Sequence, residues 1–216
     1  MDHSEHRKRI LARYDRGEYL EDHELLEILL FFSRPRVNTN GIAHDLIDTC
    51  GSLGDVFHST EDRLVSVDGV GTHSARLIRI ISDIMFRCNL SACDTTRIFS
   101  DVSERERFLY ALFDGEENEK VYMIMFSKTK RYIGFDLIGE GLLSKGEICV
   151  TNATEKALKS GATHVIIAHN HPGGLALASK TDSESAERMN IIFGDAGITV
   201  AAHYVVAGHK CKTYGK

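Results

Sequence analysis

The hydrophobic pattern changes near the middle of the chain, and this change restricts the fold more than any other feature of the sequence. Before it, apolar residues recur three and four positions apart, as in residues 22–33 (DHELLEILLFFS), which predicts amphipathic helices. After it come β-branched or alternating apolar runs, which predict strands. The predicted strands are residues 121–127, 132–139, 164–169 and 198–208, and the helices among them are residues 103–113, 151–161 and 180–197.

Strands and helices that interleave in this way indicate an α/β (α+β) fold. We predict an N-terminal helical domain over residues 1–92 and a mixed-sheet domain with flanking helices over residues 100–216. The polar, aperiodic segment NLSACDTTRIFS marks the boundary between them.

Composition excludes several classes of protein. No apolar run approaches the roughly 20 residues that span a bilayer, and the start, MDHSEHRKRI, lacks the apolar core of a signal peptide. We therefore expect a cytoplasmic protein with no membrane association. The net charge of -5 gives no overall basic surface, so any contact with nucleic acid would be local. The cysteines lack the spacing of a zinc knuckle, and we expect free thiols at Cys50, Cys88, Cys93, Cys149 and Cys211.

The segment VIIAHNHPGGLALASKTDSES carries the strongest chemical signal. His169 and His171 are two residues apart at the end of a predicted strand, so their side chains share one face, and neutral imidazoles suit Zn²⁺. Ser179 and Asp182 have the spacing of an N-cap and an N3 residue at the start of the next helix, where the carboxylate can turn back towards the histidines. Three protein ligands leave a fourth position for water, which is typical of a catalytic zinc site.

These four residues, with their spacing, resemble the JAMM signature of the JAB/MPN metalloprotease superfamily. The resemblance implies Zn²⁺ held by His169, His171 and Asp182, and hydrolysis of a peptide or isopeptide bond by metal-activated water. It also implies that Ser179 helps to hold the oxyanion. The substrate implied is a peptide or a protein.

The superfamily motif places a general-base glutamate between a helix and the first strand of the domain. Glu119 lies just before the predicted strand 121–127, and it is the residue that we favour. Glu140 is the second candidate and Glu147 the third. Glu116 and Glu117 lie in the same segment as Glu119 and are further possibilities.

Two further histidines lie in predicted strands. His164 is five residues before His169, so alternation places it on the opposite face, and we interpret it as structural. His203 is either a satisfied core histidine or the donor of a hydrogen bond to a metal ligand.

The whole chain resembles the bacterial RadC family, long labelled a DNA-repair family. HELLEILLFFS, GSLGDVF and LVSVDGVGTHSARLIRI are similar to its N-terminal helical region, and AHNHPGG with Ser179 and Asp182 is similar to its metallo-domain. VDGVGTHSA also resembles a helix-hairpin-helix element, whose turn at Gly69–Gly71 could present backbone N–H groups to a phosphate of DNA. Acidic residues cancel the arginines of this segment, so a packing or protein-interaction module is the alternative interpretation.

Two functions from different classes follow. The first is a zinc-dependent metallohydrolase joined to a helical accessory domain. The second is a DNA-associated binding protein whose metal site is structural or vestigial. A metal-dependent nuclease is disfavoured because two-metal phosphodiester chemistry usually needs more clustered carboxylates. The sequence leaves the substrate and the oligomeric state open.

Overall fold

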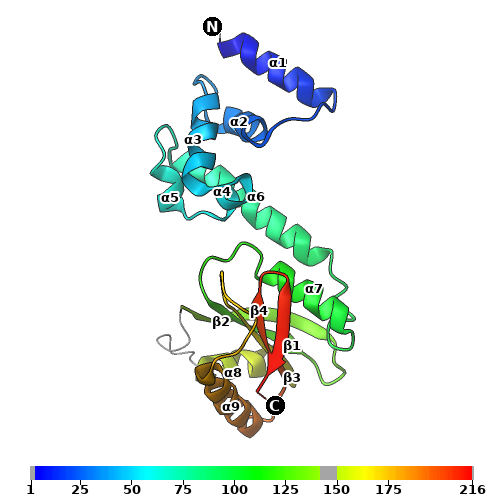
Figure 1. The fold of residues 1–216 in the computed structure, drawn as a ribbon. Helices are drawn as coiled ribbons and strands as arrows, with labels where there is room; N and C mark the ends of the chain where they lie inside the picture. The colour runs from blue at the N-terminus through cyan, green and yellow to red at the C-terminus, as the bar shows by residue number, and fades with distance from the viewer. Residues whose placement is uncertain (1–2, 142–149, 216) are drawn as a thin grey trace. The chain divides into compact units, whose positions relative to one another are not determined.

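The computed structural model describes residues 3–141 and 150–215. Contacts divide the chain into two compact units, Met1–Met85 and Phe86–Lys216, and the division falls within the long helix α6 (Thr72–Ser91; Figure 1). None of the described helices is both long enough and apolar enough to cross a membrane.

The end of α6 belongs to the second unit because of its packing. Phe86 and Leu90 lie against the aromatic core of that unit, so the chain changes from one core to the other within a continuous helix. The domains predicted from the sequence, 1–92 and 100–216, have their boundary in the polar segment that follows this helix, and those bounds stay a prediction.

The first unit is helical, as the spacing of its apolar residues predicted. Its helices before α6 are α1 (His3–Asp15), α2 (Asp22–Ser33), α3 (Asn40–Cys50), α4 (Leu53–His58) and α5 (Glu61–Val65). One apolar cluster joins α2 to α6, and its deeply buried members include Leu26, Leu30, Leu46, Val56, Leu64 and Ile78.

The second unit contains a five-stranded mixed sheet in the order β2-β1-β3-β4-β5. The strands are β1 (Lys120–Phe126), β2 (Tyr132–Glu140), β3 (His164–Asn170), β4 (Thr199–Ala207) and β5 (Lys210–Tyr214). β3 pairs with β4 in parallel and with β1 in antiparallel, and the other pairs are antiparallel. Helices followed by a mixed sheet confirm the predicted α/β (α+β) class.

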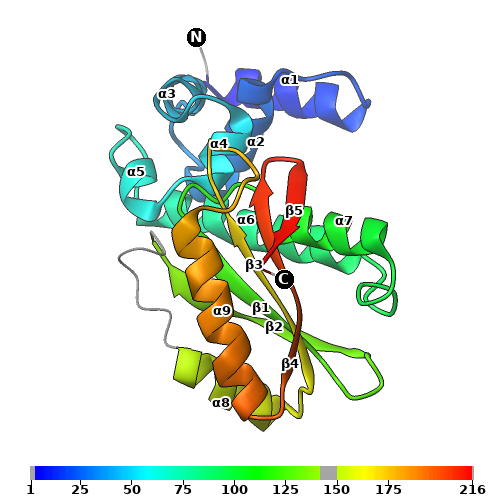
Figure 2. The ribbon, with the colours of Figure 1, turned by 60° about the horizontal axis from the view of Figure 1, so that its bottom comes forward.

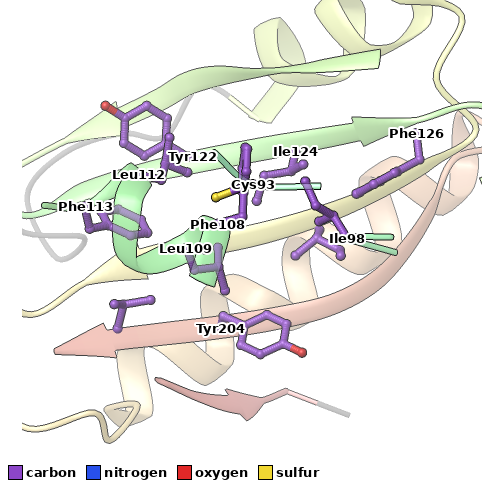
Figure 3. Close-up of a cluster of buried hydrophobic side chains, with 13 residues drawn as sticks. Cys93, Ile98, Phe108, Leu109, Leu112, Phe113, Tyr122, Ile124, Phe126 and Tyr204 are labelled. Atoms are coloured by element: carbon purple, nitrogen blue, oxygen red, sulfur yellow. The ribbon is translucent and has the colours of Figure 1, made fainter. Parts of the chain in front are cut away.

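Helices cover both faces of this sheet (Figure 2). They are α7 (Val102–Leu112) on one face, and α8 (Val150–Ser160) and α9 (Lys180–Asp195) on the other. Side chains alternate along β1, so Tyr122, Ile124 and Phe126 point towards α7, where Figure 3 shows them around Phe108 and Leu109. The intervening residues of β1 point towards α8 and α9. Alternation therefore decides which residues of β3 can meet α9.

The sequence pattern did not reveal β5. This strand is short and largely polar, with lysines at its first and third positions, as is common for an edge strand that must not pair with other chains. It follows β4 through a two-residue turn in which Gly208 has φ +54°, the conformation that a type II′ hairpin requires at its first central position. β5 brings Tyr214 beside His203 of β4.

Candidate metal centre

Three residues of the predicted site come together on the α9 side of the sheet. His169 lies at the end of β3, His171 follows it, and Asp182 lies in the first turn of α9. The two Nε2 atoms are 3.1 Å apart, and each lies 3.6 Å from Oδ2 of Asp182. His169 and Asp182 are almost fully buried, with side-chain exposures of 1% and 3%, whereas His171 is 20% exposed.

The spacing of these atoms can be compared with that of zinc ligands. Ligands at 2.0–2.1 Å around a tetrahedral ion are separated by about 3.3–3.4 Å, and the observed separations of 3.1 and 3.6 Å lie on either side of this value. A circle through the three atoms has a radius of about 2.0 Å, which is a Zn–ligand bond length. The donor set therefore fits Zn²⁺ in both chemistry and size.

The carboxylate is fixed by the start of α9. Ser179 is the N-cap and Asp182 is the N3 residue, as predicted: the Asp182 amide donates to Ser179 Oγ at 3.1 Å, and the Ser179 amide donates to Asp182 Oδ2 at 2.6 Å. Burial is the largest influence on the Asp182 pKa and raises it. The imidazole of His169, 3.6 Å away, and the hydrogen bonds with Ser179 outweigh burial and hold this pKa well below its usual range. Asp182 is therefore a carboxylate, as a metal ligand must be.

The Nδ1 atoms of the two histidines have partners outside the cluster. His171 Nδ1 lies 3.2 Å from the carbonyl oxygen of Leu175, and because a carbonyl only accepts, this bond requires the proton on Nδ1. A neutral His171 then presents the Nε2 lone pair to the cluster. His169 Nδ1 lies 3.0 Å from the hydroxyl of Tyr214, which can accept in the same way. Such outer hydrogen bonds orient metal-binding histidines.

Sequence reasoning missed Tyr214, because its strand was not predicted and its hydroxyl reaches the cluster from two strands away. Burial, and then the negative charge of Asp182, raise the pKa of Tyr214 well above its usual range. The phenol therefore stays neutral beside His169.

The glutamates predicted as general-base candidates differ in the face of the sheet on which they lie. Glu119 immediately precedes β1, and because Val121 pairs with His169, alternation places Glu119 on the face that carries the cluster. Glu140 pairs with Lys120, which lies on the opposite face, and Glu116 forms an ion pair with Lys120 at 2.6 Å. Glu117 is exposed and Glu147 lies outside the described residues.

The carboxylates of Glu116 and Glu140 also influence a buried tyrosine. The pKa of Tyr122, which belongs to the core under α7, is raised to about 12, first by burial and then by these two carboxylates. Their placement on the face opposite His169 rests on their pairing with Lys120. Among these described glutamates, Glu119 is the one placed on the sheet face that carries His169, as its predicted role as general base requires.

The remaining strand histidines differ in burial and partners. His164 lies on the α7 face, with its ring 5.6 Å from that of Phe99, as alternation predicted. His203 is buried, and its Nε2 lies 2.9 Å from Oδ1 of Asn190 in α9. Its Nδ1 has no hydrogen-bond partner among the described residues, so His203 donates no hydrogen bond to a member of the cluster. Burial, and then the charge of His169, lower the pKa of His203 to about 4, so this imidazole is neutral at pH 7.

The glycine turn of the first unit has a packing explanation. Gly69 has φ +82°, and a Cβ on it would lie 2.7 Å from Cδ1 of Ile42 in α3. Val70 is buried in the same core, and Arg79 forms an ion pair with Glu61 at 3.0 Å. DNA contact through this turn stays a prediction.

Two comparisons relate the chain to known proteins. Residues 99–214, more than half of the chain, match the family model described as the RadC-like JAB domain. The chain is also similar to the UPF0758 protein FN0909 of Fusobacterium nucleatum subsp. nucleatum, with 25% identity over 214 residues, which cover 95% of this chain and 92% of that protein. The match includes every strand of the sheet and all three residues of the cluster, and it shows that the chain belongs to the RadC family.

Proposed function

We propose that this RadC family member is a zinc-dependent hydrolase that cleaves a peptide-type bond in a peptide or a protein. The observation that carries the proposal is the triangle of donor atoms formed by His169, His171 and Asp182. Its radius of about 2.0 Å matches a Zn–ligand bond length, and two imidazoles with one carboxylate are donors that suit Zn²⁺.

The arrangement favours a catalytic metal over a structural one. Among the described residues, the cluster comprises three potential ligands, and no fourth His, Cys, Asp or Glu joins them. A structural zinc site is normally closed by four protein ligands. His171 is also partly exposed, which gives a substrate a route to the open position.

Zinc in this site would supply a water molecule with a pKa of about 7 and a Lewis acid for the substrate carbonyl. Glu119, on the same face of the sheet, would take a proton from the attacking water and pass it to the leaving nitrogen. Ser179 Oγ already accepts from the amide of Asp182, so its hydrogen is left to donate to the oxyanion.

The alternative is a DNA-associated protein with a structural or vestigial metal site. In the first unit, Gly69 is explained by its close approach to Ile42, and Arg79 is paired with Glu61. These observations do not favour phosphate binding at the turn, so hydrolysis is the function that we propose.

Elemental analysis of the purified protein tests the metal assignment. We expect one zinc per chain in the wild type, and its loss in His171→Ala and Asp182→Ala. His164→Ala is the matched control, because this histidine lies on the same strand but faces α7, and it should retain zinc. Unchanged zinc in both site variants would refute the assignment.

Digestion of a mixed peptide library, followed by mass spectrometry, tests the chemistry. Glu119→Gln should keep the zinc and lose cleavage, while Glu140→Gln should keep both, because Glu140 lies towards the other face. A fully active Glu119→Gln protein would show that Glu119 is not the base.

A further inference from the structure

Asn170 lies between His169 and His171 in the sequence, and its side chain bonds to the backbone on both sides of Glu119. It is the last residue of β3, it is only 4% exposed, and both ends of its side-chain amide are hydrogen-bonded. Oδ1 accepts from the backbone amide of Lys120 at 2.6 Å, and Nδ2 donates to the backbone carbonyl of Asn118 at 3.0 Å. The two bonds therefore flank Glu119.

The side chain replaces a peptide group that the sheet lacks at this point. The backbone pairing of β3 with β1 ends at His169 and Val121. The amide of His171 lies on the other side of β3, where it donates to the carbonyl of Val206 in β4 at 2.8 Å, so it adds nothing to the pairing with β1. A primary amide offers one acceptor and one donor side by side, as a peptide group does, so Asn170 adds one more rung to this ladder.

This added rung fixes the backbone on both sides of Glu119. On the other edge of the segment, the amide of Gly141 donates to the carbonyl of Glu119 at 2.7 Å. Hydrogen bonds that point to opposite edges at successive residues define an extended backbone, so the Glu119 side chain must project from the face that carries Val121 and His169.

We propose that Asn170 is a positioning residue for Glu119: its side-chain amide sets where the Glu119 carboxylate stands relative to His169 and His171. The proposal rests on the proposed function, in which Glu119 is the base and the two histidines hold the metal. Since Asn170 is covalently joined to both histidines, one residue links the position of the base to that of two ligands. A base that acts through one water molecule must be placed within hydrogen-bond reach of it, which explains the need for such a link.

Amide hydrogen exchange tests the contact in the full-length protein without any metal. Asn170→Ala removes both bonds, so exchange at the Lys120 amide should become at least tenfold faster. Val165→Ala is the control, because it is a buried residue of the same strand that does not touch residues 118–120 and should leave the Lys120 amide protected. Unchanged exchange at Lys120 in Asn170→Ala would overturn the proposal.

Replacement of zinc by Co²⁺ tests the link to Glu119 without a substrate. The visible absorption of the cobalt-loaded protein should change with pH, and Glu119→Gln should shift the pH at which this change is half complete. Asn170→Ala should shift that pH in the same direction. If Asn170 acts through Glu119, the double variant should match Glu119→Gln alone, whereas Val165→Ala and Glu119→Gln should be independent. Additive shifts for Asn170→Ala and Glu119→Gln would contradict the proposal. A wild-type protein that takes up no metal would end the proposed function, and the exchange rate at Lys120 alone would then decide the role of Asn170.

Discussion

Tyr214→Phe should weaken zinc binding although Tyr214 would not touch the metal. The substitution removes one oxygen atom, whose 3.0 Å contact with His169 Nδ1 orients the imidazole. In the variant, the buried Nδ1–H would face an apolar ring, and an unsatisfied buried donor costs about 1–3 kcal/mol. Because about 1.4 kcal/mol corresponds to a factor of ten, we expect zinc affinity to fall by about tenfold to a hundredfold. The usual effect of removing a group that supports a metal ligand has the same size.

The assay is a competition titration against a chromophoric zinc chelator at pH 7. Tyr204→Phe is the matched control, because it removes the same atom from a buried tyrosine of the same sheet. The Tyr204 hydroxyl accepts from Arg105 Nε at 2.7 Å on the α7 face, so its loss should lower stability by about 1 kcal/mol and leave zinc affinity unchanged. Equal affinities for Tyr214→Phe and the wild type would refute the reasoning.

Three other substitutions test separate parts of the structure. The pKa of His203 in the folded protein, about 4, lies below the usual histidine pKa of about 6.5, so its contribution of about 3 kcal/mol to stability is present above about pH 6.5 and is lost as the pH falls towards 4. Denaturant unfolding of the metal-free protein should show this loss in the wild type but not in His203→Gln. Gly69→Ala should destabilise the first unit by about 1–2 kcal/mol in the same assay, because φ is positive and Ile42 is close, whereas Gly71→Ala, with open space around it, should have a much smaller effect. Ser179→Ala should cost about 1 kcal/mol through loss of the N-cap, and a thermal unfolding midpoint equal to that of the wild type would contradict the capping argument.

The sequence predicted the parts of the fold that depend on local pattern. Helical spacing, alternation and capping residues were enough for the class of the fold, for the side of β3 on which His164 lies, and for the roles of Ser179 and Asp182 at the start of α9. All of these are properties of one element or of two successive ones.

Features that depend on strand register could not be predicted in the same way. The glutamates near β1 look alike in the sequence, and only the pairing of Val121 with His169, and of Lys120 with Glu140, separates their faces. Tyr214 depends on the partner that β5 selects at the edge of the sheet. Register is a property of two strands at once, so it is absent from the pattern of either one.

Two of the three proposed ligands are placed by the hydrogen bonds of the secondary structure itself. His169 is held by the β1–β3 ladder and Asp182 by the hydrogen bonds that begin α9, so the bonds that define these elements also place the ligands. His171 differs, because its ring is oriented by the carbonyl of Leu175 in an exposed loop. The free energy of metal binding would therefore be spent mainly on ordering His171 and this loop. It follows that changes in the loop should alter zinc affinity through His171, whereas changes in the sheet that leave His169 and its contact with Tyr214 in place should act mainly through stability.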